Sequence, residues 1–114
     1  MSFCISIREL GEDLCELYSD HAEWSVKTFG SDADRGPIGA LRHLEKEAAE
    51  AQGNPTDSSE YADCLLLILD ASRRAGIGLA ELINAAAKKM EVNKSRRWPE
   101  PTPDEPVEHL EAAK

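Results

Sequence analysis

The amino-acid sequence predicts an all-α fold, a bundle of four helices completed by oligomerisation. Apolar residues recur at helical spacing in four segments, and Gly, Pro and Asn separate these segments. The 114 residues are enough for one small domain. Because so short a helical chain buries a modest core, subunit interfaces are expected to complete it.

Glycine and proline mark the limits of the first two helices. A helix is expected from about Ile7 to Phe29, because its apolar residues have mostly helical spacing and Gly30 can end it. A second helix is expected over about residues 37–52. Pro37 suits its first position, where the missing N–H costs nothing.

A break at residues 53–56 precedes the third helix, for which Asp57 and Glu60 resemble a capping box. This helix runs to Arg74 and is apolar nearly all round, so it is expected to be the most buried of the four. A fourth helix is expected over about residues 79–96.

The C-terminal segment is rich in proline and acidic residues. Four prolines fall within residues 99–106, which excludes a helix and predicts an extended or mobile tail. The expected organisation is therefore a helical domain over residues 1–98 followed by a tail over residues 99–114.

The composition limits the classes of partner. A formal net charge of −9 argues against a general binder of nucleic acid or membrane surfaces, because both attract the opposite sign. No apolar run reaches the roughly 18 residues that a membrane span needs. The three cysteines are odd in number and lack metal-type spacing, as expected of reduced thiols in a soluble cytoplasmic protein.

Four carboxylates fall in two helix-spaced pairs, Glu47 with Glu50 and Glu60 with Asp63. Residues three apart on a helix point to one side, so two packed helices can bring four acids to one spot. Asp63 is expected to be buried, where an unpaired carboxylate is costly unless a cation or a proton relieves it. Mg²⁺ takes oxygen ligands and is usually completed by substrate phosphates. The sequence thus predicts metal-dependent phosphate chemistry.

Ordinary ion pairing and capping compete with the metal hypothesis for each acid. Glu47 can face a neighbouring cation, and Glu60 can be only a capping-box acid. Asp70 can simply pair with Arg74 one turn on. For the four acids of the two pairs taken together, a shared metal is the more economical account.

Basic and aromatic residues are candidates for substrate contacts. Five of the 13 Lys and Arg lie within residues 88–97, where they can hold phosphates or only complement the helix dipole. His43, one turn before Glu47, can bond to an acid or to a substrate group. Three of the six aromatic residues flank a loop or helix end and can fill a core or stack on a base; they are Trp24, Phe29 and Trp98.

The two acid pairs, with nine residues between them, resemble the ExxE…ExxD signature of the MazG-like all-α nucleoside triphosphate pyrophosphohydrolases. Further motifs over almost the whole chain are similar to the dATP/dGTP pyrophosphohydrolase branch, which is common in phages. These motifs are Trp24-Ser25, Thr28-Phe29-Gly30, Gly36-Pro37, His43-Leu44-x-Lys46-Glu47-Ala48-x-Glu50, Glu60-Tyr61-Ala62-Asp63-Cys64, Asp70-Ala71-x-Arg73-Arg74-Ala75-Gly76, Lys89-x-x-x-Asn93-x-x-Arg96-x-Trp98-Pro99 and Glu105-Pro106-Val107-Glu108-His109.

This resemblance implies a MazG-like helical domain that converts (d)GTP, and also dATP, to the monophosphate and pyrophosphate. Water attacks the α-phosphorus, and Glu47 or Glu50 takes its proton. Two or three Mg²⁺ or Mn²⁺ ions per site are implied, held by Glu47, Glu50, Glu60 and Asp63. The implied assembly is a homodimer or homotetramer.

Substrate contacts are also implied by the resemblance, for the phosphates or sugar and for a purine base. The implied contacts are Lys89, Asn93 and Arg96 for the phosphates or sugar, and Trp24, Phe29 and His43 for the base.

Three other functions compete with this one. A dCTP-type or broad deoxynucleotide pyrophosphatase has the same chemistry with a different base. A di-iron or ferritin-like bundle usually pairs acids with Glu-x-x-His, and no His follows an acid at that spacing in the expected helices. A non-catalytic helical module would use its acidic strip to bind a basic partner.

Overall fold

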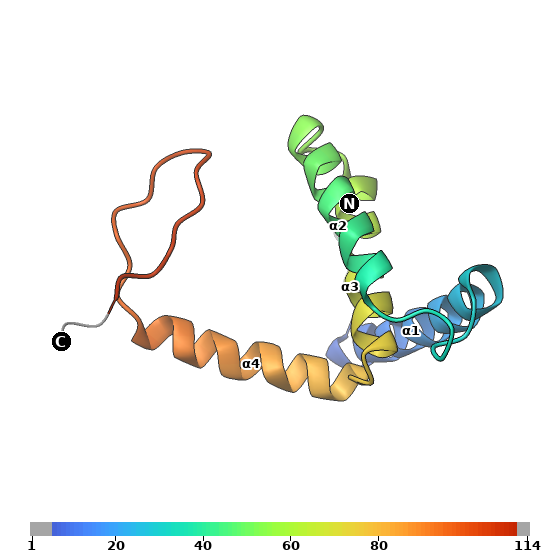
Figure 1. The fold of residues 1–114 in the computed structure, drawn as a ribbon. Helices are drawn as coiled ribbons and strands as arrows, with labels where there is room; N and C mark the ends of the chain where they lie inside the picture. The colour runs from blue at the N-terminus through green and yellow to red at the C-terminus, as the bar shows by residue number, and fades with distance from the viewer. Residues whose placement is uncertain (1–5, 112–114) are drawn as a thin grey trace. The chain divides into compact units, whose positions relative to one another are not determined.

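The computed structural model describes residues 6–111, in which four α-helices follow one another without a strand (Figure 1). The helices are α1 (Ile7–Phe29), α2 (Ile38–Gly53), α3 (Ser58–Arg74) and α4 (Leu79–Ser95). The predicted all-α class is confirmed, and the helix bounds agree closely with those expected from the sequence. Completion of the bundle by oligomerisation stays a prediction.

Capping contacts explain where α1 and α3 begin. Ser6 Oγ accepts a 3.1 Å hydrogen bond from Glu9 N, and Glu9 Oε2 accepts one of 3.1 Å from Ser6 N. At α3 the Asp57 carboxylate accepts from Ser59 N at 2.9 Å. The predicted capping box with Glu60 is wrong in its second half, because the Glu60 side chain lies among other acids and makes no return bond among the described residues.

The loop between α1 and α2 begins at Gly30, whose φ of 108° lies in the region that favours glycine. Pro37 is the N-cap of α2 and makes no side-chain hydrogen bond there. It therefore lies one residue before the first helical position that the sequence predicted for it.

The chain divides into two compact units, Met1–Leu79 and Ala80–Lys114. In the first unit α2 and α3 lie side by side, and α1 contacts α3 over a smaller area (Figure 1). The buried apolar core of the described residues is small, and polar side chains are buried beside it. The buried apolar residues are Ala40, Leu69 and Ala71, and the buried polar ones are Ser25, Asp70 and Arg74.

α3 carries most of the buried residues, as predicted, but they lie in its second half. Tyr61 and Leu65 near its start are exposed in the single chain. Within residues 6–111, no helix is both long and apolar enough to cross a bilayer.

The second unit contains α4 and the proline-rich segment that follows it. Residues 96–111 contain no helix, as predicted. The segment folds back instead of extending: Leu110 N donates a 2.7 Å hydrogen bond to Arg97 O, and the His109 ring lies 5.9 Å from the Trp98 ring. These contacts close the stretch into a loop, so the first predicted alternative, an extended chain, is wrong here, and the second, a mobile tail, stays a prediction. A domain limit at residue 98 stays a prediction.

Candidate functional site

Glu47 on α2 and Glu60 and Asp63 on α3 come together, and we call these three residues the acid cluster. Each offers one carboxylate oxygen, and these oxygens lie within 4.8 Å of one another. The short connection between α2 and α3 returns the chain, so that acids of the two helices face each other. Helical spacing then keeps Glu60 and Asp63 on one side of α3.

Two carboxylate oxygens of the acid cluster are buried. Glu47 Oε2 and Glu60 Oε2 have no hydrogen-bond partner among the described residues. A buried polar atom left unpaired is costly, and divalent cations prefer such hard oxygen ligands. The donor set therefore fits Mg²⁺ or Mn²⁺. Asp63 is exposed, so its predicted burial is wrong, because the early turns of α3 are open in the single chain.

Glu50 lies beside the acid cluster without belonging to it. Its side chain is exposed, so the structure groups three of the four predicted ligands and leaves Glu50 next to Glu47. Glu47 raises the pKa of Glu50, first because a protonated Glu50 can donate a hydrogen bond to the Glu47 carboxylate and then through charge repulsion. Burial, and then the charges of Asp57, Glu47 and Asp63, raise the pKa of Glu60. In both residues the neighbouring acids therefore disfavour the ionised form.

His43 contacts the acid cluster from α2. Its Nε2 lies 3.0 Å from Oε1 of Glu47, one helical turn away. Of the two partners predicted for His43, an acid or a substrate group, the structure shows the acid. The imidazole is 56% exposed, so it also reaches the open space beside the cluster.

A pocket of about 180 Å³ adjoins the acid cluster and is walled by α1, α2 and α3. Trp24 and Phe29 meet edge to face in its wall, with ring centroids 5.3 Å apart. Trp24 is 53% exposed and Phe29 48%, so both rings remain open to a ligand. The complete lining is His21, Trp24, Phe29, His43, Glu47, Asp63, Leu66, Leu67 and Asp70.

Sequence reasoning missed His21 and Leu66 as pocket residues. His21 lies three residues before Trp24, and this spacing was the available signal because it places both on one side of α1. Their rings lie 5.8 Å apart. The predicted pairing of Asp70 with Arg74 is confirmed, with Arg74 Nε donating to Asp70 Oδ2 at 3.2 Å.

The predicted phosphate contacts lie in the second unit. Lys89 and Asn93 are one turn apart on α4, and Arg96 follows the end of the helix. Trp98 Nε1 donates a 2.8 Å hydrogen bond to Asn93 O. The contact of these side chains with a substrate stays a prediction.

A second hollow, of about 630 Å³, lies along α1. Its lining residues come from this one helix, so it is an open acidic helix face without a second wall. They are Asp13, Glu16, Leu17, Ser19, Asp20 and Glu23.

Comparison with known families identifies the class of protein. The model of the dATP/dGTP pyrophosphohydrolase family matches residues 17–114 of this chain. The chain belongs to this family. The resemblance read from the acid pairs and the other motifs is thus confirmed.

Relatives of this family member come from phages. The Eaa protein of Salmonella phage P22 is 50% identical over 91 residues, which are 80% of this chain. A dATP/dGTP diphosphohydrolase of Salmonella phage PMBT28 is 38% identical over 76 residues, or 66% of this chain. The matched regions span only 28% and 24% of these two relatives.

A solved structure shares the fold. The MazG-like pyrophosphohydrolase of cyanophage S-2L, bound to dGDP and three catalytic Mn²⁺ ions per active site, superposes with a TM-score of 0.67 at 27% identity. The match covers 85% of this chain and 96% of the cyanophage chain. The predicted MazG-like architecture is therefore confirmed.

Proposed function

We propose that this chain hydrolyses a purine nucleoside triphosphate, (d)GTP or dATP, to the monophosphate and pyrophosphate. The acid cluster carries the proposal, because carboxylate oxygens that are buried without a partner from residues 6–111 adjoin an aromatic pocket. Membership of the dATP/dGTP pyrophosphohydrolase family supports the substrate class. The dGDP and Mn²⁺ in the similar cyanophage protein support it further.

Glu47, Glu60 and Asp63 would hold the divalent ions, with Glu50 as the fourth ligand beside them. Two or three Mg²⁺ or Mn²⁺ ions per site are part of the proposal. Such ions supply a Lewis acid at the phosphate oxygens and lower the pKa of water. The hydrogen bond from His43 would hold the Glu47 carboxylate in place for this role.

Glu50 is suited to accept a proton from the water that attacks the α-phosphorus. It is exposed beside Glu47 and outside the acid cluster, so a carboxylate oxygen of Glu50 that no metal engages can take this proton. Glu47 is the alternative base in this proposal. Attack forms a new P–O bond at the α-phosphorus and breaks the bond to the bridging oxygen, so that pyrophosphate leaves.

Recognition of the rest of the nucleotide is divided between two groups of residues. Trp24 and Phe29 would stack on the base and His43 would contact it, since all three line the pocket. Lys89, Asn93 and Arg96 would contact the phosphates or the sugar.

A homodimer or homotetramer is also proposed. Large apolar side chains are exposed on α1 and α3, among them Leu10 at 59% and Leu65 at 46%. Exposed apolar residues on several helices of so small a core support burial between subunits.

The test is a screen of the full-length chain with the common nucleoside and deoxynucleoside triphosphates, in Mg²⁺ and in Mn²⁺. Pyrophosphate, distinguished from orthophosphate by phosphorus NMR, is the expected product, with dGTP, GTP and dATP preferred. In ¹⁸O-labelled water the label should enter the monophosphate. Release of orthophosphate contradicts the proposal, and a dCTP preference contradicts its purine part. Glu60→Gln should be inactive, and Glu45→Gln, an exposed acid of α2, is the matched control.

A further inference from the structure

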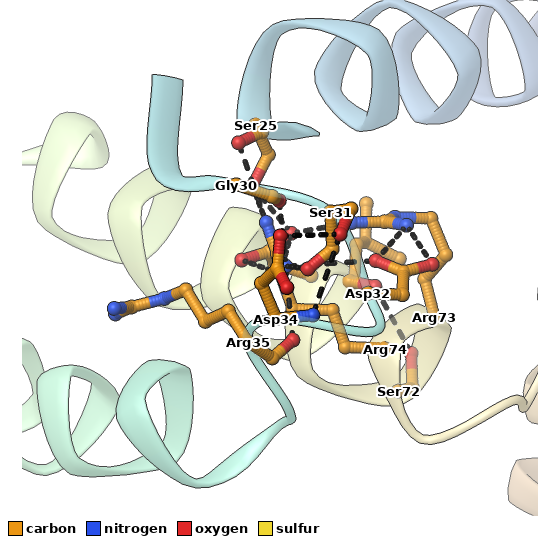
Figure 2. Close-up of polar contacts among 11 residues, drawn as sticks. Ser25, Gly30, Ser31, Asp32, Asp34, Arg35, Ser72, Arg73 and Arg74 are labelled. Carbon is orange, nitrogen blue, oxygen red and sulfur yellow. Dashed lines mark hydrogen bonds and ion pairs between the residues drawn. The ribbon is translucent and has the colours of Figure 1, made fainter. Parts of the chain in front are cut away.

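The side chains of Ser25, Asp70 and Arg74 form a buried polar network that joins α1, the loop after it and α3. We call this network the Arg74 hub (Figure 2). The Arg74 side chain has no solvent exposure. Ser25 Oγ donates a 2.7 Å hydrogen bond to Asp70 Oδ1, and Arg74 Nη2 donates to Ser25 Oγ at 2.9 Å. Arg74 Nη1 donates to Gly30 O at 3.1 Å and to Arg35 O at 3.0 Å.

The fork of the Arg74 guanidinium matches these acceptors in direction as well as in charge. An arginine presents several N–H groups in a fixed plane, so its hydrogen bonds fix the orientation of whatever accepts them. A buried ion pair is weak evidence for stability, whereas a fully bonded polar network restrains geometry. The Arg74 hub therefore restrains how the C-terminal end of α1 and the following loop lie against α3.

The aromatic wall of the pocket is directly attached to the Arg74 hub. Trp24 precedes Ser25 in the chain, and Phe29 precedes Gly30. Asp70 belongs to the hub and also lines the pocket. The buried apolar side chains of the described first unit are few, so polar contacts carry much of the attachment of α1 at this point.

The acid cluster lies on other elements than the aromatic wall. Glu47, Glu60 and Asp63 lie on α2 and α3, which contact each other more extensively than α1 contacts α3. A change in the hub should therefore affect the aromatic wall and leave the metal ligands in place.

We propose that Arg74 is a positioning residue for the nucleotide pocket: it sets the place of Trp24 and Phe29 relative to the acid cluster. The inference rests on the proposed function for the identity of the ligand. The positioning itself is testable without any nucleotide.

The experiment compares two proteins that both carry Trp98→Phe, so that Trp24 is the only tryptophan in each. One keeps Arg74, and the other also carries Arg74→Lys. Lysine keeps the charge and loses the fork. Hydrogen exchange of residues 24–30 should rise about tenfold, and exchange of residues 58–66 should not change. Mn²⁺ affinity, from calorimetry without nucleotide, should change by less than about twofold. The affinity for a non-hydrolysable α,β-imido analogue of dGTP, from Trp24 quenching, should fall about tenfold or more.

Arg73→Lys is the matched control at the neighbouring position. Arg73 bonds to Asp32 and Asp70 and has no hydrogen bond to α1 among the described residues. In Arg73→Lys, the hydrogen exchange of residues 24–30 and the nucleotide affinity should change much less than in Arg74→Lys.

Two results overturn the inference. One is unchanged exchange of residues 24–30 in Arg74→Lys, and the other is an equal loss of Mn²⁺ and nucleotide affinity, which indicates general unfolding of the site. If Arg74→Lys does not fold, Ser25→Ala removes one hub hydroxyl and should act in the same direction to a smaller extent; no change there also overturns it. If the unchanged chain binds Mn²⁺ and no nucleotide, the proposed function fails, while the exchange and Mn²⁺ measurements still decide the positioning.

Discussion

His43 Nε2 lies 3.0 Å from Oε1 of Glu47, and Oε2 of the same carboxylate is buried without a partner among the described residues. One oxygen of Glu47 is thus oriented by the protein, and under the proposed function the other binds a metal ion. Partners that orient a metal-binding side chain usually contribute to metal affinity although they do not touch the ion.

Removal of this orienting contact should weaken the metal site. His43→Ala is expected to lower Mn²⁺ affinity and kcat/KM by about 10- to 100-fold. His43→Gln can keep a hydrogen bond to Glu47 and should lose less. Calorimetry with Mn²⁺ measures the affinity, and Arg42→Ala, an exposed residue of the same helix, is the control. Equal Mn²⁺ affinity in His43→Ala and the unchanged chain would contradict this role.

Glu60 should oppose folding when no metal is bound. Burial and neighbouring acids raise the pKa of Glu60, so its ionised form is disfavoured in the folded chain. Glu60→Gln is therefore expected to raise Tm in EDTA and to abolish the rise in Tm that Mn²⁺ produces in the unchanged chain. Differential scanning fluorimetry checks both effects, with Glu45→Gln as the control. A lower Tm in EDTA would show that the Glu60 carboxylate stabilises the fold by itself.

The stability of the metal-free chain should depend on pH through Glu50 and Glu60. Their raised pKa values mean that the folded chain holds these protons more tightly than the unfolded chain. The stabilisation that these two protonated groups give the folded chain is present below their ordinary pKa of 4.5. It is lost as the pH rises through their raised pKa values. Urea unfolding in EDTA measures it as the difference from the double variant Glu50→Gln, Glu60→Gln. If this difference in unfolding free energy is the same at about pH 4 and at about pH 7, the prediction is refuted. Saturating Mn²⁺ should reverse the trend, because binding needs ionised carboxylates.

The stability that Asp70 contributes should depend on pH in the opposite direction. Burial alone would raise its pKa, but hydrogen bonds from Ser25 and Arg73 and the charge of Arg74 together lower it. Its contribution is therefore present above the ordinary value of 3.8 and is lost as the pH falls through the lowered pKa. Asp70→Asn should cost about 3 kcal/mol of unfolding free energy at neutral pH, because it leaves Arg74 buried without its partner. Urea unfolding at neutral and acidic pH should show this cost shrinking in acid. Asp13→Asn, on the exposed face of α1, should show no such pattern.

Loss of the Trp24 ring should weaken nucleotide binding more than turnover. Base stacking on an aromatic side chain is worth about 1–3 kcal/mol, so Trp24→Ala should raise KM by roughly 5- to 150-fold with a smaller change in kcat. Trp24→Phe should lie between Ala and the unchanged chain. Steady-state kinetics with dGTP check this, and a loss confined to kcat would place Trp24 outside the base pocket.

Much of the fold was predictable because its causes are local. Apolar spacing, the Asp57 cap and the break at Gly30 act within a few residues, and the helices begin and end close to where these signals lie. The tail was predicted less well. The hydrogen bond between Arg97 and Leu110 joins distant positions, and proline content does not reveal it.

The candidate site was predictable in its residue types and less so in its geometry. The spacing of the acids identified Glu47, Glu60 and Asp63 as candidate ligands, because helical periodicity decides which side chains share a face. It did not distinguish Glu50, which lies outside the cluster, because exposure depends on packing between helices.

The sequence by itself determined four helices, two acid pairs and the family, because each is encoded by local spacing and short motifs. Only the tertiary structure decided which carboxylate oxygens are buried and which residues wall the pocket. The burial of the oxygens depends on how α2 packs against α3, and the pocket depends also on how α1 lies against α3, where Ser25 reaches Asp70 and Arg74 across 45 and 49 positions of the chain. Contacts of that range result from packing of the whole unit, which no local pattern specifies.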